Sequence, residues 1–195
     1  MRKHLFIIAL GLALAACSGS GTTGSGSSAG KLSMQMKPTT ISKLDMKKDF
    51  VAIKGIVSPL SLNVDSKPII RYMIDLTDFE YEANASSKPK DDKQMLVTIA
   101  LFGKSGDTAE TPLRTGSFEL APQYAKVDEK YDRISNVYGT VFKDGKTEEY
   151  SFTTGGKGTV KINSVSGDTV SGEIDMTQEN GGSIKGNFTA QMKKK

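Results

Sequence analysis

The sequence predicts an all-β protein in which residues 31–195 form one domain, and three observations lead to this prediction. Short runs of alternating apolar and polar residues recur along this part of the chain. Glycine, aspartate, asparagine and serine, which are typical turn residues, separate the runs. No stretch of 12 residues keeps the apolar period of a helix. The expected strands are 49–57, 68–77, 94–103, 116–120, 134–142, 147–154, 158–165, 169–176 and 183–192.

The last three strands are expected to form an antiparallel meander. Their inward apolar residues all have even numbers, so a slip of one residue in either hairpin would expose a whole set. For the first hairpin this favours a three-residue loop at 166–168, which places Ile174 opposite Val160. For the second hairpin we place Ile174 opposite Ile184 and Gly172 opposite Gly186.

On the outer face of this meander, the same registers place Glu173 between Lys161 and Lys185. Opposite charges on neighbouring strands stabilise a sheet by a few tenths of a kcal/mol for each pair, on the order of 0.2–1 kcal/mol. We therefore expect this row of three charged residues to face solvent.

Two earlier segments are also informative. The run 143–146 contains Asp144-Gly145, which favours a type I′ turn because both central residues take positive φ. This turn sets Val137 opposite Phe152 and Gly139 opposite Tyr150. Strand 94–103 is apolar on both faces, which indicates a central strand that is covered on both sides.

These elements predict an antiparallel β-sandwich of about eight or nine strands that ends in the three-stranded meander. We prefer the sandwich because the central strand needs apolar cover on both of its faces. The alternative is a closed β-barrel.

The start of the chain has the features of a signal peptide. Residues 1–4 form a short positive head, and the 12 residues 5–16 are apolar or small without any charge. A membrane-spanning helix needs about 20 such residues. The segment 1–16 is therefore expected to be removed rather than to span a bilayer.

The end of this segment, Leu14-Ala15-Ala16-Cys17, resembles the lipobox of bacterial lipoproteins. This resemblance covers only residues 1–17 and implies that Cys17 receives a covalent lipid, with diacylglycerol on its sulfur, and that the chain is cut just before it. It also implies location in the cell envelope. Because Ser18 stands where an aspartate resembles an inner-membrane retention signal, we expect the outer membrane if the organism is diderm, facing the periplasm or the surface.

Residues 17–30 are interpreted as the lipidated cysteine followed by a disordered tether. The 13 residues 18–30 contain only glycine, serine, threonine and alanine, and they can bury almost no apolar surface. A Gly/Ser coil of this length has an end-to-end distance of about 20 Å. The tether would hold the domain close to the lipid without fixing its orientation.

Processing changes the charge and the chemistry of the chain. Loss of Arg2 and Lys3 lowers the basic count from 26 to 24, against 22 acidic residues, so no nucleic acid partner is expected. The single histidine, His4, is removed, and the single cysteine carries the lipid. Catalysis by Ser-His-Asp or Cys-His groups and the usual zinc sites are therefore excluded from the mature chain.

Three weaker patterns complete the candidates. Asp75, Asp78, Glu80 and Glu82 could bind calcium or act as the carboxylate pair of a hydrolase, although alternating acids also suit a solvated strand end. Tyr124 and Tyr131 could stack on a sugar or anchor a partner in a long loop, although they could equally cover the end of the sandwich. The basic end 193–195 is interpreted as a solvated terminus, with contact to anionic lipid or polymer as the alternative.

The expected function is a membrane-anchored lipoprotein whose β-domain is a non-enzymatic binding or structural module, with an envelope protein or a polysaccharide as partner. We expect no cofactor apart from the covalent lipid on Cys17 and no resident metal. One alternative is a barrel that carries a lipid or another small hydrophobic ligand. The other is a hydrolase that uses carboxylates.

Overall fold

The computed structural model describes residues 28–64, 67–81, 88–104, 106–120 and 133–193. These residues form eleven β-strands and no helix, which confirms the all-β class. The strands are β1 (Gly30–Met36), β2 (Met46–Ala52), β3 (Lys54–Val64), β4 (Lys67–Thr77), β5 (Met95–Phe102), β6 (Gly116–Leu120), β7 (Arg133–Lys143), β8 (Lys146–Ser151), β9 (Gly156–Ser166), β10 (Thr169–Gln178) and β11 (Ser183–Met192).

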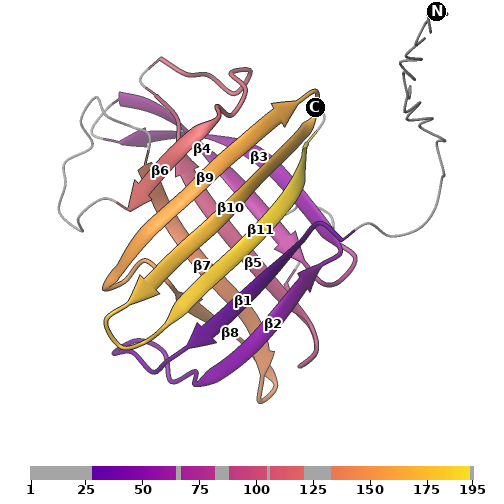
Figure 1. Cartoon of the computed structure of the whole chain (residues 1–195), viewed down its shortest axis with the longest axis vertical. Helices are drawn as coiled ribbons and strands as arrows, with labels where there is room; N and C mark the ends of the chain where they lie inside the picture. The colour runs from indigo at the N-terminus through magenta and orange to yellow at the C-terminus, as the bar shows by residue number, and fades with distance from the viewer. Residues whose placement is uncertain (1–27, 65–66, 82–87, 105, 121–132, 194–195) are drawn as a thin grey trace, which may run out of the picture.

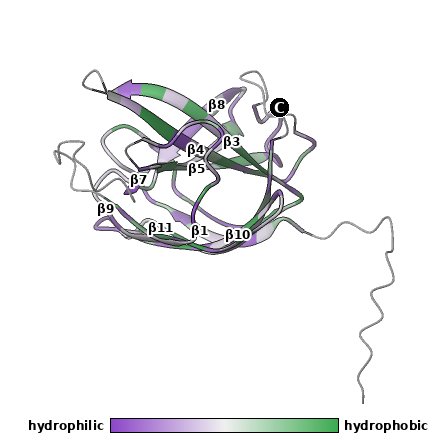
Figure 2. Ribbon diagram, turned by 90° about the horizontal axis from the view of Figure 1, so that it is seen from above, coloured by the Kyte–Doolittle hydropathy of each residue, from purple (hydrophilic) through white to green (hydrophobic). Residues whose placement is uncertain are grey.

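The strands form one sheet that closes on itself. Eight of them are hydrogen-bonded in the cyclic order β3-β4-β5-β7-β6-β9-β10-β11, because β11 pairs with both β10 and β3. Figure 1 shows β9, β10 and β11 crossing in front of β4, β5 and β7, and Figure 2 shows the same two layers from above. The sheet is thus a closed barrel, the alternative topology, flattened into two facing layers.

At two corners of this barrel, a short parallel ladder joins one layer to the other. At one corner β11 pairs with β3 through Gln191 and Met192, and at the other β6 pairs with β7 through Glu119 and Leu120. The remaining strands extend the layers beyond the ring: β1 and β2 continue outward from β11, and β8 continues outward from β7. Among the described strands, β2 pairs only with β1 and β8 only with β7, so each ends its layer.

The strand count exceeds the expectation for two reasons. The segment predicted as one strand, 49–57, is divided at the exposed Ile53 into β2 and β3, where the chain passes from one layer to the other. In addition, β1 was not predicted, although its buried residues Leu32, Met34 and Met36 alternate as a half-buried strand requires. Gly30, which was assigned to the tether, is the first residue of β1.

The meander of β9, β10 and β11 is confirmed, but its first turn differs from the prediction. Ser166 pairs with Thr169, so the loop has two residues rather than three. The expected register, with Ile174 opposite Val160, is nevertheless reached because the ladder shifts between Ser171 and Gly172. The shift is a β-bulge, which restores the inward face of β9 after the tight turn.

The second hairpin of the meander is displaced by two residues from the predicted register. Gly172 lies opposite Phe188, and Ile174 lies opposite Gly186. A Cβ atom added to Gly172 would lie 2.6 Å from Cζ of Phe188, so the ring occupies the space that the glycine leaves open. Each glycine is therefore matched with a large side chain rather than with the other glycine.

The displacement also changes the row of charges on the outer face. Glu173 forms the expected ion pair with Lys161, at 3.5 Å. Lys185 instead pairs with Asp175, at 2.9 Å, because Glu173 now lies opposite Asn187. The prediction of three charged residues in one row is therefore half correct.

The two informative central segments are confirmed. Asp144 and Gly145 both have positive φ, at 52° and 78°, as the type I′ turn requires. Gly139 lies opposite Tyr150, and the N–H of Phe152 donates to the carbonyl oxygen of Val137 at 2.8 Å. Strand β5 lies between β4 and β7, and all of its residues except the last are buried.

One cluster of buried side chains fills the space between the two layers. It draws residues from every strand of the sheet, and the largest fully buried members include three phenylalanines and two tyrosines. Small eight-stranded barrels are commonly filled by side chains in this way. Because side chains fill the interior, other molecules can contact the barrel at its two ends and on its outer faces. The largest of these side chains are Tyr72, Tyr150, Phe50, Phe152 and Phe188.

Candidate functional site

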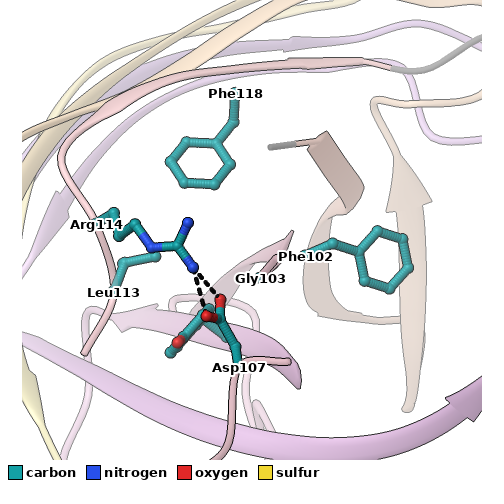
Figure 3. A pocket seen from close by; sticks show the side chains of 7 residues that line it. Phe102, Gly103, Asp107, Leu113, Arg114 and Phe118 are labelled. Atoms are coloured by element: carbon teal, nitrogen blue, oxygen red, sulfur yellow. Dashed lines mark hydrogen bonds and ion pairs between the residues drawn. The ribbon is translucent and has the colours of Figure 1, made fainter. Parts of the chain in front are cut away.

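A small pocket lies at the end of the barrel where β5 connects to β6. It is lined by aromatic and aliphatic side chains and contains a charged pair in its wall. Figure 3 shows the arrangement, in which Phe118 and Asp107 lie on opposite sides of the Arg114 guanidinium. The lining residues are Tyr72, Phe102, Gly103, Asp107, Leu113, Arg114 and Phe118.

The connection that builds this pocket is held by its own polar residues. The N–H of Asp107 donates to the Lys104 carbonyl oxygen at 3.0 Å, and the N–H of Lys104 donates to Asp107 Oδ2 at 2.6 Å. A second turn follows, in which the N–H of Thr111 donates to the carbonyl oxygen of Thr108 at 2.9 Å. A Cβ atom on Gly103 would lie 2.7 Å from Asp107 Oδ2, so glycine allows the carboxylate to approach the end of β5.

The charged pair links the two sides of the connection. One guanidinium nitrogen of Arg114, Nη2, donates to both carboxylate oxygens of Asp107. Asp107 thus accepts hydrogen bonds from a backbone N–H and from the Arg114 guanidinium. These partners offset the cost of removing a mostly buried carboxylate from water. The pair holds the connection across the barrel end, between Gly103 and β6.

Tyr72 forms the inner wall of the pocket and is almost completely buried. Its hydroxyl group donates to the carbonyl oxygen of Thr111 at 2.7 Å, which fixes the second turn. Burial, assisted by the negative charge of Asp107, raises the pKa of Tyr72 to about 12, while Arg114 acts in the opposite direction. The phenol therefore remains protonated at neutral pH, and it is neither a general base nor a nucleophile there.

The free space in the pocket is small. The cavity volume is about 10 Å³, which is room for roughly one water molecule. The carboxylate and the guanidinium neutralise each other, and the neighbouring phenol holds its proton. The arrangement is therefore suited to closing the end of the barrel rather than to transferring protons or holding an organic ligand.

Asp107→Asn is expected to lower the free energy of unfolding by about 1–2 kcal/mol, because the half-buried guanidinium loses its charged partner. Urea unfolding followed by circular dichroism measures the loss. The control is Asp45→Asn, which breaks the exposed pair with Lys37 and is expected to change the stability by less than about 0.5 kcal/mol. Equal losses for both variants would contradict a special role of the Asp107–Arg114 pair.

The acidic segment that suggested calcium is tied into the sheet. Asp75 lies on β4 and accepts hydrogen bonds from the hydroxyl groups of Tyr81 and Thr98, both at 2.7 Å. Burial, together with the hydrogen bond to Asp75, raises the pKa of the Tyr81 phenol, so this donor keeps its proton. Both carboxylate oxygens of Asp75 are thus occupied by side chains that the sequence pattern had not suggested.

The other acids of that segment do not join Asp75. Asp78 accepts the N–H of Met95 at 2.7 Å and forms an ion pair with Lys48 at 3.3 Å, so it fixes the start of β5 beside β2. Glu80 is exposed to solvent, and Glu82 lies outside the described residues. Within the part of the chain that the structure describes, no three acidic, histidine or cysteine side chains converge to hold a metal ion.

A second buried polar group was not anticipated either. The Tyr150 hydroxyl accepts the N–H of Lys37 at 3.0 Å and lies 2.7 Å from Oε1 of Gln178. The amide nitrogen of Gln178 donates to the carbonyl oxygens of Ser151, at 3.0 Å, and Thr154, at 2.7 Å. This network joins the ends of β1, β8 and β10, so its role is to hold three separate segments together.

The remaining predicted site residues, Cys17, Tyr124 and Tyr131, lie outside the described residues. The described part of the chain also contains no helix with the length and apolar character needed to cross a lipid bilayer. Searches for similar protein families, curated proteins and solved structures find no match to this chain.

Proposed function

We propose that this chain is a bacterial lipoprotein, anchored in the cell envelope by lipid on Cys17, and that its β-domain is a non-enzymatic binding or structural module. The observation that carries the proposal is the run Leu14-Ala15-Ala16-Cys17, which ends a charged and apolar leader of signal-peptide length. The following Gly/Ser segment leads directly to the first strand of the barrel.

The non-enzymatic part of the proposal is supported by the chemistry of the described polar groups. Asp107 is neutralised by Arg114, and Asp75 is bound by two hydroxyl groups. Tyr72 has a raised pKa, and the tightly packed interior is built from apolar side chains. These groups stabilise the fold and offer no activated nucleophile or base, so we assign binding to the outer surface of the domain.

Cys17→Ala is expected to block processing, because a lipid cannot be attached to alanine and the specific peptidase acts after lipid attachment. Intact mass measured on protein from cells distinguishes the outcomes. The wild-type chain should lack residues 1–16 and carry the mass of the lipid, and the variant should retain those residues and carry no lipid. The neighbouring variant Ser18→Ala serves as the control and should be processed like the wild type.

Normal maturation of the Cys17→Ala chain, with unchanged membrane retention, would refute the anchor. The non-enzymatic part has its own test. A hydrolytic activity that is lost after Asp75→Asn or Asp78→Asn, in chains with unchanged unfolding midpoints, would overturn it in favour of a carboxylate hydrolase.

A further inference from the structure

Two exposed apolar side chains lie side by side along the chain at one end of β2. Val51 is 47% exposed and Ile53 is 51% exposed, and they flank the buried Ala52. Large exposed apolar side chains among the described residues occur at only two other places, Ile41 and Leu60. Of these four residues, only Val51 and Ile53 lie within two positions of each other in the sequence.

Ala52, the residue between them, is hydrogen-bonded to Ala29, where the tether joins the domain. The N–H of Ala29 donates to the carbonyl oxygen of Ala52 at 2.6 Å, and the N–H of Thr189 donates to the carbonyl oxygen of Ala29 at 2.6 Å. Gly30 then pairs with Ala52 on one side and with Phe188 on the other. The chain is therefore held from Ala29 onward, directly beside the exposed pair.

Basic side chains border this position. Lys31 lies directly opposite Val51 on the neighbouring strand, and Lys54 follows Ile53. Neither lysine has an ion-pair partner among the described side chains. The acid nearest to Val51 along β2 is Asp49, two residues away on the same face.

The basic end of the chain lies beside β3, five residues along β11 from Phe188, the partner of Gly30. The N–H of Lys193 donates to the carbonyl oxygen of Val57, near the start of β3. Two further lysines follow Lys193 in the sequence. Surfaces that rest on anionic lipid typically combine apolar side chains with nearby lysines. The apolar groups enter the headgroup region, and the lysines contact the lipid phosphates.

We propose that Val51 and Ile53, with Lys31 and Lys54, form a lipid-facing surface on which the domain rests against an anionic membrane. The inference depends on the proposed lipid anchor at Cys17. The 11 residues between Cys17 and Ala29 would span about 17–20 Å in the Gly/Ser coil that the sequence predicts. This short link keeps the corner of the barrel at a high effective concentration over the bilayer, so even a weak surface is sufficient to orient the domain.

The small size of the surface favours lipid over a protein partner. A stable protein interface buries roughly 800 Å² on each partner, which is far more than two apolar side chains supply. A tethered domain needs much less, because the lipid on Cys17 already holds it at the membrane. For the same reason the exposed Ile41 is not part of the surface. It lies beyond the far end of the β1–β2 pair, about 20 Å away at the rise of a seven-residue strand.

The test uses the full chain, expressed in cells and lipidated, with one added cysteine for an environment-sensitive fluorophore. Because lipid occupies the Cys17 sulfur, a cysteine introduced by Val51→Cys is the one that reacts. The protein is reconstituted in vesicles of phosphatidylcholine mixed with phosphatidylglycerol. We expect emission from position 51 to rise about twofold and to be quenched by nitroxide-labelled lipid, as for a group in the headgroup region. The control is the same label at Ile41→Cys, which should stay in water.

A second variant tests the charges. Lys31→Glu combined with Lys54→Glu, in the chain labelled at position 51, should return the emission to the level seen on pure phosphatidylcholine. Equal emission and quenching at positions 51 and 41 would overturn the proposal. So would a signal that depends on the protein-to-lipid ratio but not on the lipid quencher, since that indicates a second copy of the chain.

Intact mass separates this inference from the anchor on which it rests. If Cys17 carries lipid and the label at position 51 remains in water, the lipid-facing surface is refuted while the anchor stands. If Cys17 carries no lipid, the proposed function itself fails. Circular dichroism of each labelled chain establishes that the exposed substitutions leave the sheet intact.

Discussion

Replacing Gly186 with alanine should reduce the free energy of unfolding by about 3 kcal/mol or more, because two separate costs combine at this position. Gly186 has a φ of +146°, a conformation that residues with a Cβ atom rarely adopt. An added Cβ would also overlap the backbone carbonyl oxygen of Lys31 and lie 2.9 Å from Cα of Leu32. Backbone atoms cannot rotate away, so β1 would have to separate from β11. Urea unfolding followed by far-ultraviolet circular dichroism measures the loss.

Gly181→Ala provides the matched control for this variant. Gly181 also has a positive φ, at 86°, but an added Cβ would meet no atom within 4 Å. Only the conformational cost remains, which is about 1 kcal/mol. Equal losses for Gly181→Ala and Gly186→Ala would show that the close approach of β1 and β11 is not what requires glycine at position 186.

Phe152→Ala should cost about 3–5 kcal/mol, the usual range for deleting a fully buried aromatic ring. Phe152 follows β8, has no exposed surface, and packs edge-on against Tyr150 with ring centroids 4.9 Å apart. Its ring also lies close to Gly139, so deletion would open a cavity over Gly139 in the core between the two layers. The backbone hydrogen bond from Phe152 to Val137 should survive, because it does not depend on the side chain.

The control for Phe152 is Phe142→Ala on the same hairpin. Phe142 lies on β7 opposite Thr147 and is only partly buried. Its deletion removes less apolar surface from contact with the core and should cost about 1 kcal/mol. A loss at Phe142 as large as that at Phe152 would contradict the assignment of the core to the space between the layers. Both losses are measured as midpoint shifts in urea.

The meander illustrates how far the sequence could determine the fold. Even numbering of the apolar residues gave the correct parity of the register for most of the meander, but the three pairs next to the first turn keep the register that it had excluded, and the ladder shifts between Ser171 and Gly172. Even numbering could not distinguish registers that differ by two, because both keep the same residues inside. The choice was made by packing, with Phe188 filling the space over Gly172, and no pattern in a single strand records that contact.

The topology was harder to predict for a related reason. Closure of the barrel depends on two parallel ladders of two residue pairs each, at Gln191–Met192 and Glu119–Leu120. Such short pairings leave no periodic signal in the sequence. The strand β1 did leave one, in Leu32 and Met34, but it follows the Gly/Ser segment directly and was not among the predicted strands.

The candidate sites also differ in whether their residues are consecutive in the sequence or are brought together by the fold. A motif of consecutive residues such as the one ending in Cys17 can be read directly, because its chemistry is local. The Asp107–Arg114 pair spans seven residues of an irregular connection, and its partner groups come from Tyr72 and Phe118 on other strands. Convergence of this kind becomes visible only when the three-dimensional arrangement is known.

The placement of β1 has a mechanical consequence. This first strand after the tether is paired on both sides, with β2 and with β11, and it is antiparallel to each. A force applied through the proposed lipid anchor would pull along the axis of β1 from Gly30. The hydrogen bonds of both ladders would then share the load in shear, instead of opening one after another as in unzipping. The strand nearest to the proposed anchor would therefore resist extraction from the sheet.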